Sequence, residues 1–260
     1  MPNNEMKNNR LTAYITGATS GFGRAVALRL AANGYDIVIT GRRKERLETL
    51  AEEITKTTPA KTWISSYDIR DKDAVEKAID TLPDAWKQID VLLNNAGLAA
   101  GLNPIQKGSL DDWEQMIDTN VKGLLYVTRK IAPLMIARNS GHIINIGSIA
   151  GKEVYLNGNV YCATKHAVDA LTKAMRMDML PYGIKVTQIA PGAAETEFAL
   201  VRFKGNQEAA DNIYKGYQPL TGKDIAEIVE YLLKLPKHVC INDMVVTCLA
   251  QANTVHLCKN

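Results

Sequence analysis

The chain has 260 residues, enough to bury a large core as one α/β domain. Its 31 Lys and Arg residues against 28 Asp and Glu residues give a net charge of +3 without a basic run, which argues against nucleic acid as a partner. No apolar stretch reaches the roughly 20 residues that a membrane span needs, so we expect no membrane partner either. The polar residues 1–10 lack the apolar core of a signal peptide and predict a flexible tail, followed by a single domain over residues 11–260.

The four cysteines show no C-x-x-C pairing, and the four histidines are too few to complete a metal site of the usual spacing. Free thiols in a reducing compartment are the simplest interpretation. We therefore expect a cytoplasmic protein without a bound metal. The cysteines are Cys162, Cys240, Cys248 and Cys258.

A glycine-rich stretch, TGATSGFG from Thr16 to Gly23, joins an apolar run to an amphipathic one. The run from Leu11 to Ile15 predicts a short buried strand, and the periodic apolar residues after the glycines predict a helix. This order places free backbone N–H groups at the positive end of a helix, which favours phosphate binding. Gly17 can form the tight turn, Gly21 lets the main chain approach a ligand, and Gly23 permits close helix packing. The spacing G-x-x-x-G-x-G also fits a plain strand-to-helix connection.

Two arginines follow the second predicted strand, which runs from Asp36 to Thr40. Arg42 and Arg43 stand about 20 residues past the glycine turn, where an NAD-selective fold carries an acidic residue. A guanidinium binds a phosphate at two points, so the pair predicts NADP, with Arg42 as the better candidate for its 2′-phosphate. Alternatively, both are solvated at the start of the helix expected over residues 44–56.

Polar residues also follow the next two strands. The strand from Thr62 to Tyr67 ends at Asp68-Ile69, where Asp68 could accept a hydrogen bond from adenine or could cap the helix expected over residues 71–82. The strand over residues 89–93 precedes Asn94-Asn95-Ala96-Gly97. We expect the two carboxamides to bridge strands while the main chain lies against a flat ligand; a generic turn is the alternative.

The second half of the chain continues the alternation. A helical run over residues 111–138 has apolar residues on several faces, so it needs a partner, either the sheet or another subunit. Asn120 within it is a poor helix former, and Pro133 should bend or interrupt its later part. Strands over residues 142–146, 185–190 and 244–247 and helices over residues 160–180 and 223–235 follow. Residues 193–221 are expected to form an irregular lid or binding loop. This alternation predicts a doubly wound parallel sheet with helices on both faces.

Three residues carry the predicted chemistry. Tyr161 and Lys165 are four residues apart, hence on one helix face, and Ser148 follows a strand end. A neighbouring ammonium and an oxidised nicotinamide would lower the tyrosine pKa from about 10, so that Tyr161 can exchange a proton with a substrate hydroxyl. Lys165 would also hold the nicotinamide ribose, Ser148 would orient the substrate oxygen, and Asn120 could fix a water. By itself Y-x-x-x-K is also typical of a surface aromatic beside a solvated lysine.

Together with Pro191-Gly192, these motifs resemble the short-chain dehydrogenase/reductases in order and spacing over nearly the whole chain. The resemblance implies a Rossmann-like sheet of about seven strands, a catalytic tetrad and commonly a homotetramer packed through the two long helices. The tetrad is Asn120, Ser148, Tyr161 and Lys165.

A closer resemblance, to NADP-dependent 3-hydroxy acid dehydrogenases, is carried by the stretches GRRKERL from Gly41, TEF from Thr196 and VRFKG from Val201. It implies an NADP-binding catalytic domain with cofactor contacts at Gly17, Ala18, Thr19, Ser20, Gly21, Phe22, Gly23, Arg42, Arg43, Asp68, Ile69, Asn95, Ala96, Gly97, Tyr161, Lys165, Pro191, Gly192 and Thr196. Two places depart from the family pattern: Ala193-Ala194 replaces a bulky pair, and the tail from Thr247 is less typical. Both departures could reshape the pocket.

The expected reaction is hydride transfer between NADP and the 3-hydroxyl of a small 3-hydroxy acid, such as L-allo-threonine, L-serine or 3-hydroxyisobutyrate. Charged residues between 193 and 215 fit a small charged substrate, and Arg202 or Lys204 is our candidate for its carboxylate; solvated lid residues are the alternative. A second hypothesis keeps the fold and tetrad but takes another carbonyl, such as a steroid, sugar or 3-oxoacyl ketone. A third is a non-catalytic, NADP-sensing regulator.

Overall fold

The computed structural model describes residues 10–259 and contains one seven-stranded sheet with the order β3-β2-β1-β4-β5-β6-β7. Every neighbouring pair is parallel, as the sequence predicts. The order in which strands are added reverses between β1 and β4, because β2 and β3 lie on one side of β1 and the later strands lie on the other. The strands are β1 (Leu11–Ile15), β2 (Tyr35–Gly41), β3 (Thr62–Ser66), β4 (Ile89–Asn94), β5 (His142–Ile146), β6 (Lys185–Pro191) and β7 (Asp243–Val246).

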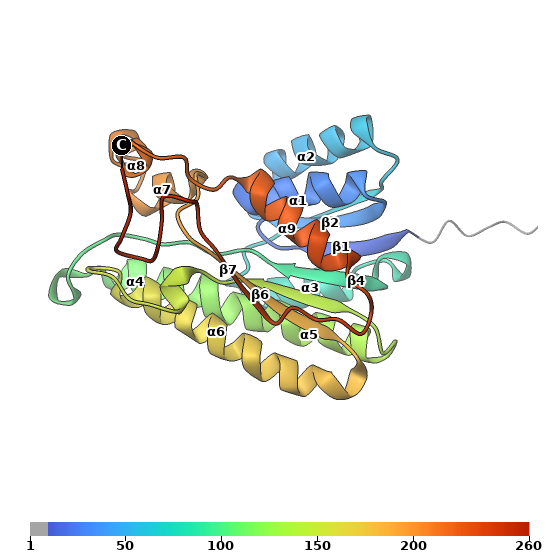
Figure 1. The fold of residues 1–260 in the computed structure, drawn as a ribbon. Helices are drawn as coiled ribbons and strands as arrows, with labels where there is room; N and C mark the ends of the chain where they lie inside the picture. Colours follow the sequence, from blue (N-terminus) through green and yellow to red (C-terminus); the bar gives the residue numbers. More distant parts are fainter. Residues whose placement is uncertain (1–9, 260) are drawn as a thin grey trace, which may run out of the picture.

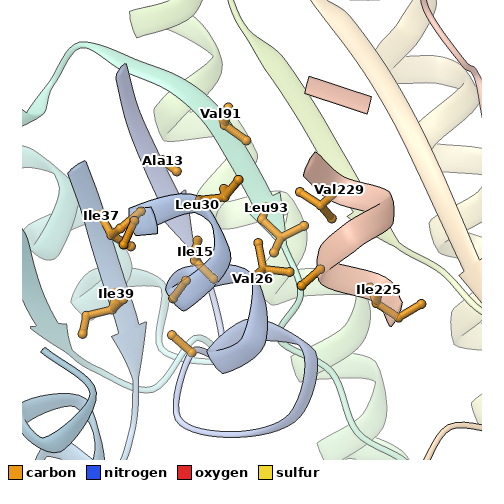
Figure 2. Close-up of a cluster of buried hydrophobic side chains, with 14 of the residues drawn as sticks. Ala13, Ile15, Val26, Leu30, Ile37, Ile39, Val91, Leu93, Ile225 and Val229 are labelled. Carbon is orange, nitrogen blue, oxygen red and sulfur yellow. The ribbon is translucent and has the colours of Figure 1, made fainter. Parts of the chain in front are cut away.

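Helices cover both faces of the sheet (Figure 1). On one face α1 (Gly21–Ala32), α2 (Lys44–Thr57) and α9 (Gly222–Lys234) pack against β1, β2 and β4. Figure 2 shows this core, where Ala13 and Ile15 of β1 meet Val26 and Leu30 of α1 and Val229 of α9. On the other face lie α3 (Lys72–Asp80), α5 (Leu124–Ile136) and α6 (Asn159–Met179), against Tyr14 and its neighbours. Because successive strand residues point to opposite faces and helices cover both, the central strands are mostly apolar; the buried polar side chains within them, such as Asn94 and Asn145, are hydrogen-bonded.

The predicted helix over residues 111–138 is divided into three parts. The α-helix α4 (Leu110–Ile117) passes into a π-helical turn, Asp118–Gly123, and then into α5. Asn120 lies in the π-helical turn, a feature that often occurs at functional sites. The interruption expected at Pro133 is absent, since α5 continues through this residue to Ile136. Buried side chains on either side of Pro133, at Ile131 and Met135, hold this part of the helix against the sheet.

Residues 193–221 are not irregular as predicted, because they contain two short helices, α7 (Glu197–Arg202) and α8 (Gln207–Tyr214). Each begins with a side-chain cap: Thr196 accepts from the Phe198 N–H at 3.2 Å, and Asn206 accepts from the Ala209 N–H at 3.0 Å. Between them Lys204 and Gly205 adopt positive φ angles of 53° and 88° and reverse the chain.

The predicted tail, residues 1–10, lies outside the described residues except for Arg10, which pairs with Asp36 at 3.1 Å. Among residues 10–259, no helix combines the length and the apolar character that crossing a membrane requires.

Candidate active site

A cavity of about 860 Å³ opens at the carboxyl ends of the strands. Its floor includes Gly17 after β1, Gly41 at the end of β2, Asn95 after β4, Gly147 after β5 and Pro191 at the end of β6. Ligands of open α/β sheets bind at this edge, beside the point where the strand order reverses. The volume lies toward the upper end of the range for ligand sites, roughly 300–1,000 Å³, so a large ligand fits.

The glycine turn forms one wall of the cavity. Gly17 has a φ of +66°, and a Cβ added to Gly23 would lie 2.4 Å from the Gly17 carbonyl oxygen, so both positions favour glycine. Ser20, which precedes α1, makes no side-chain capping bond, so the first N–H groups of this helix stay available to an anion. Five residues of the turn line the cavity, namely Gly17, Thr19, Ser20, Gly21 and Phe22, whereas Ala18 and Gly23 lie behind them.

Arg42 and Arg43 differ in the hydrogen bonds that their guanidinium groups make within the protein. Arg43 donates to Thr19 Oγ1 at 2.8 Å, to Ser20 Oγ at 3.1 Å and to Glu197 Oε2 at 2.9 Å. Arg42 makes no side-chain hydrogen bond within residues 10–259; Asp68 Oδ2 lies 4.0 Å away, and the Arg42 side chain is 55% exposed. Both line the cavity. Arg42 is therefore the guanidinium with N–H groups free for a ligand, and Arg43 is mainly a connector.

Asp68 lies at the cavity wall with Ile69. Arg70 donates hydrogen bonds to its carboxylate from Nε at 3.0 Å and from Nη2 at 2.6 Å, and these bonds lower the pKa of Asp68. The capping alternative is wrong, because Asp71 caps α3 by accepting from the N–H groups of Asp73 and Ala74. Asp68 is thus a charged acceptor that faces the cavity.

The carboxamides of Asn94 and Asn95 bridge separate elements, as the sequence predicts. Asn94 Nδ2 donates to Asn145 Oδ1 in β5 and to Thr128 Oγ1 in α5, both at 2.9 Å. Asn95 Nδ2 donates to the carbonyl oxygens of Thr16 and Gly17, at 2.9 and 3.0 Å. These bonds fix the end of β4 against the glycine turn, so that Asn95, Ala96 and Gly97 line the cavity.

Tyr161, Lys165 and Ser148 converge on the cavity. Tyr161 lies in the first turn of α6 and Lys165 in the second, where its Nζ donates to the Ile146 carbonyl at 2.9 Å. Ser148 follows β5 and donates to the Pro191 carbonyl at 3.4 Å. The arrangement sets a phenol, a hydroxyl and an ammonium around one space. Buried groups that can donate and accept a proton, arranged in this way, can exchange a proton with a substrate oxygen.

Burial shifts both titratable groups toward their neutral forms. It raises the pKa of Tyr161 well above its usual value, although a hydrogen bond with Ser148 and the charge of Arg202 act in the opposite direction. It lowers the pKa of Lys165 to about 8. The lowered tyrosine pKa expected from the sequence is therefore not produced by the protein's own groups, because desolvation exceeds the effect of the neighbouring donors.

Asn120 does not line the cavity, although Thr119 beside it does. Its carboxamide accepts from the Leu98 N–H at 2.8 Å and donates to the Leu98 carbonyl at 2.8 Å and to Thr164 Oγ1 at 3.0 Å. The side chain thus ties the segment after β4 to α6. In the described residues its carboxamide is engaged by protein groups, and its role in fixing a water stays a prediction.

The two candidates for a substrate carboxylate are separated. Arg202, at the end of α7, lies in the cavity with its guanidinium carbon 5.5 Å from the centre of the Tyr161 ring and 5.3 Å from that of Tyr155. Its Nη2 donates to the Tyr155 hydroxyl. Lys204 lies outside the cavity and pairs with Asp112 at 3.0 Å. Lys204 is two residues beyond the end of α7, and the reversal there turns it away.

The C-terminal segment forms a wall of the cavity; the sequence indicated that the tail from Thr247 could reshape the pocket, but not which of its residues line it. Gln251 Oε1 accepts from the Ala193 N–H at 2.7 Å, and Thr254 Oγ1 donates to Glu153 at 3.0 Å. The first bond joins residues that are 58 apart in the sequence and the second joins residues that are 101 apart, so a local sequence pattern cannot predict them. Tyr155 and Phe198 also line the cavity without having been predicted there, whereas Ala193 and Ala194, expected to reshape the pocket, do line it. The residues of this C-terminal wall are Gln251, Thr254, Val255, Leu257 and Lys259.

Pro191, Gly192 and Thr196 also line the cavity, and Thr196 lies beside Gly21 of the glycine turn. Within residues 10–259 no three His, Cys, Asp or Glu side chains group as a metal site, and the four cysteines are free thiols.

Comparison with known proteins gives a consistent result. The family model described as short chain dehydrogenase matches residues 11–207. A serine 3-dehydrogenase of Agrobacterium fabrum is 46% identical over 90% of this chain and 92% of the relative, and an NADP-dependent 3-hydroxy acid dehydrogenase of Salmonella typhimurium is 47% identical over 89% and 92%. A solved closed form of serine dehydrogenase complexed with NADP+ superposes with a TM-score of 0.90 at 43% identity, covering 93% of this chain and 96% of that one. The chain therefore belongs to the short-chain dehydrogenase family.

Proposed function

We propose that the protein is an NADP-dependent oxidoreductase that interconverts a small 3-hydroxy acid and its 3-oxo acid. The observation that carries this proposal is the position of Arg202, a cation over the ring of Tyr161 in the same cavity as Ser148 and Lys165. A substrate that offers a carboxylate to Arg202 and an oxygen to Tyr161 and Ser148 fits this arrangement. The relatives named for serine and 3-hydroxy acids support the same substrate class.

The residues of the cavity fit NADP. The free N–H groups at the start of α1 suit its pyrophosphate, and the uncommitted guanidinium of Arg42 suits its 2′-phosphate. Asp68 would accept from the adenine, and Asn95, Ala96 and Gly97 would lie along the cofactor. Pro191, Gly192 and Thr196 would contact its nicotinamide half. When bound, the cofactor supplies the hydride donor or acceptor and, when oxidised, a positive ring that favours the tyrosine phenolate.

Side chains of the protein transfer the proton of the substrate hydroxyl. Tyr161 accepts the 3-hydroxyl proton during oxidation and returns it during reduction, while Ser148 holds the substrate oxygen. Lys165 contributes its ammonium beside the phenol and binds the nicotinamide ribose. Asn120 supports the site by fixing Leu98 to α6. Arg202 orients the substrate through its carboxylate, and we assign Lys204 no contact with the substrate.

One observation favours a second candidate, a reductase of a larger ketone such as a steroid, sugar or 3-oxoacyl compound. Ala193 and Ala194 line the cavity, and these small side chains leave room that a bulky pair would fill. The two candidates differ in whether a carboxylate is needed.

The proposal is tested by initial rates of NADP reduction with L-allo-threonine, L-serine and 3-hydroxyisobutyrate, each repeated with NAD. We expect turnover with at least one acid and a strong preference for NADP. Inactivity on all three, with turnover of a neutral ketone by NADPH, would move the assignment to the second candidate.

We also propose a cytoplasmic homotetramer. Four unpaired cysteines within residues 10–259 fit a reducing compartment. Leu125 of α5 and Met177 of α6, 37% and 70% exposed, are apolar side chains that a neighbouring subunit could cover. Light scattering coupled to gel filtration measures the mass; a monomer would refute the assembly.

A further inference from the structure

The carboxylate of Glu197 connects α7 to the part of the cavity where the cofactor is proposed to bind. Glu197, the first residue of α7, accepts from Arg43 Nη1 at 2.9 Å through Oε2 and from Arg46 through Oε1. Both arginines belong to the α2 region, more than 150 residues earlier in the chain. Hydrogen bonds from Arg46 and Arg43 lower the pKa of Glu197 although partial burial acts to raise it, so the group is charged at neutral pH.

The other end of the same helix carries Arg202. A helix of six residues is about 9 Å long and transmits a displacement of one end to the other. Phe198, one residue after Glu197, packs edge-on against Tyr161 with ring centres 5.5 Å apart. Glu197 therefore shares one short helix with two side chains that lie against Tyr161.

Few residues of α7 are fully buried. Ala199 is its only buried residue among the six, and Phe198 is partly buried against the cluster that contains Tyr161. The Arg202 carbonyl accepts from the Gly101 N–H at 3.1 Å at the far end. At the near end Arg43 is itself fixed, because it also donates to Thr19 and Ser20 of the glycine turn. A fixed cation facing a lightly packed helix makes an effective anchor.

We propose that Glu197 is a positioning residue that latches α7 to Arg43 and Arg46 and thereby holds Arg202 over Tyr161 for substrate binding. The inference rests on the proposed function. It assigns Arg43 to the connection between the cofactor and substrate halves and leaves the 2′-phosphate to Arg42. Because the carboxylate contacts two guanidinium groups, we expect its loss to have a larger effect than the loss of one exposed ion pair.

The first test compares Glu197→Gln with Glu53→Gln. Glu53 pairs with Arg24 at similar exposure, but this pair lies outside the cavity and joins α1 to α2. For Glu197→Gln we expect KM for the 3-hydroxy acid to rise about five- to tenfold with kcat changed less than about twofold, since oriented binding rather than the proton step is weakened. Glu53→Gln should match the wild type. Equal KM values for all three proteins would overturn the latch.

A second test is independent of turnover. Hydrogen–deuterium exchange of residues 197–206 in the protein without substrate should be faster in Glu197→Gln than in the wild type or Glu53→Gln. Arg46→Gln should give a part of this effect, and Arg46→Gln combined with Glu197→Gln should add little to Glu197→Gln alone. Unchanged exchange, or fully additive effects, would contradict the latch. If the wild type turned over no hydroxy acid, the proposed function would fail while the exchange result still decided the latch.

Discussion

The two parts of the chain that enclose the cavity are built differently. Residues 11–192 supply strand ends and helix starts, and their polar groups are fixed by buried bonds such as Asn94 to Asn145. Residues 193–259 add α9 and β7 to the core and the sheet, but what they give to the cavity is two short helices and the C-terminal wall, which contact the first part through side chains such as Glu197 and Gln251. We therefore expect the first part to set the reaction and most of the cofactor binding, and the second part to set which substrate is held. Substitutions of cavity residues in the first part should affect the reaction or the cofactor, except at Arg43, which holds Glu197. Substitutions of cavity residues in the second part should alter KM for the substrate.

The largest effect is expected at Tyr161. Tyr161→Phe removes the proton donor and acceptor while keeping the ring, so kcat should fall by about 10²–10⁴-fold. NADPH binding, measured by fluorescence titration, should stay close to the wild-type value. Retained turnover would show that the proton passes through another group.

The next effect separates the two arginines. Arg42→Ala should reduce the preference for NADP over NAD by about 10–100-fold, because charge-assisted bonds to phosphate are lost. Arg43→Ala should mainly raise KM for the hydroxy acid, since Arg43 holds Glu197. Dissociation constants for NADP and NAD measure the first effect and substrate kinetics the second. A larger loss of NADP preference in Arg43→Ala would reverse the assignment.

In the second part of the chain, Arg202 and Lys204 form a matched pair. Arg202→Ala should raise KM for 3-hydroxy acids about tenfold or more by removing a charged hydrogen-bond donor. Lys204→Ala should change KM little, because Lys204 pairs with Asp112 outside the cavity. Steady-state kinetics on the same acid decide between them. Equal effects would mean that the lid binds substrate in another arrangement.

A further prediction concerns stability rather than kinetics, again in the first part of the chain. His142 is 7% exposed and pairs with Thr187, and burial, helped by the charge of Lys185, lowers its pKa to about 4. His142 therefore stays neutral in the folded state at pH values where the unfolded state binds a proton, below about 6.5. The free energy of unfolding falls as the pH falls from about 6.5 to 4, by up to about 3 kcal/mol. His142→Gln should lose less stability between pH 7 and 5, measured by denaturant unfolding, whereas exposed His238→Gln should behave like the wild type.

The sequence predicted the regular part of the molecule well because the determining signals are local. Leu11 to Ile15 and His142 to Ile146 are apolar runs that coincide with β1 and β5, and glycines and polar residues mark their ends. In a parallel sheet those ends lie at one edge, which is why Ser148, Tyr161 and Lys165 could be placed together.

The remainder depends on contacts that no local pattern contains. The carboxamide of Asn120 is turned to Leu98 by the π-helical turn, which has no clear sequence signal. Lys204 is turned away from Arg202 by a reversal of only two residues, and the C-terminal wall is placed by bonds such as Gln251 to Ala193. Periodicity also could not show that Glu197 would meet two arginines of the α2 region.

The central claim is that one cavity binds NADP and a small carboxylate beside Tyr161. The most direct test compares initial rates for 3-hydroxyisobutyrate and its methyl ester, with NADP, in the wild type and in Arg202→Ala. Our account predicts that the wild type strongly prefers the acid and that this preference largely disappears in Arg202→Ala. A wild type that oxidises the ester as well as the acid would contradict it.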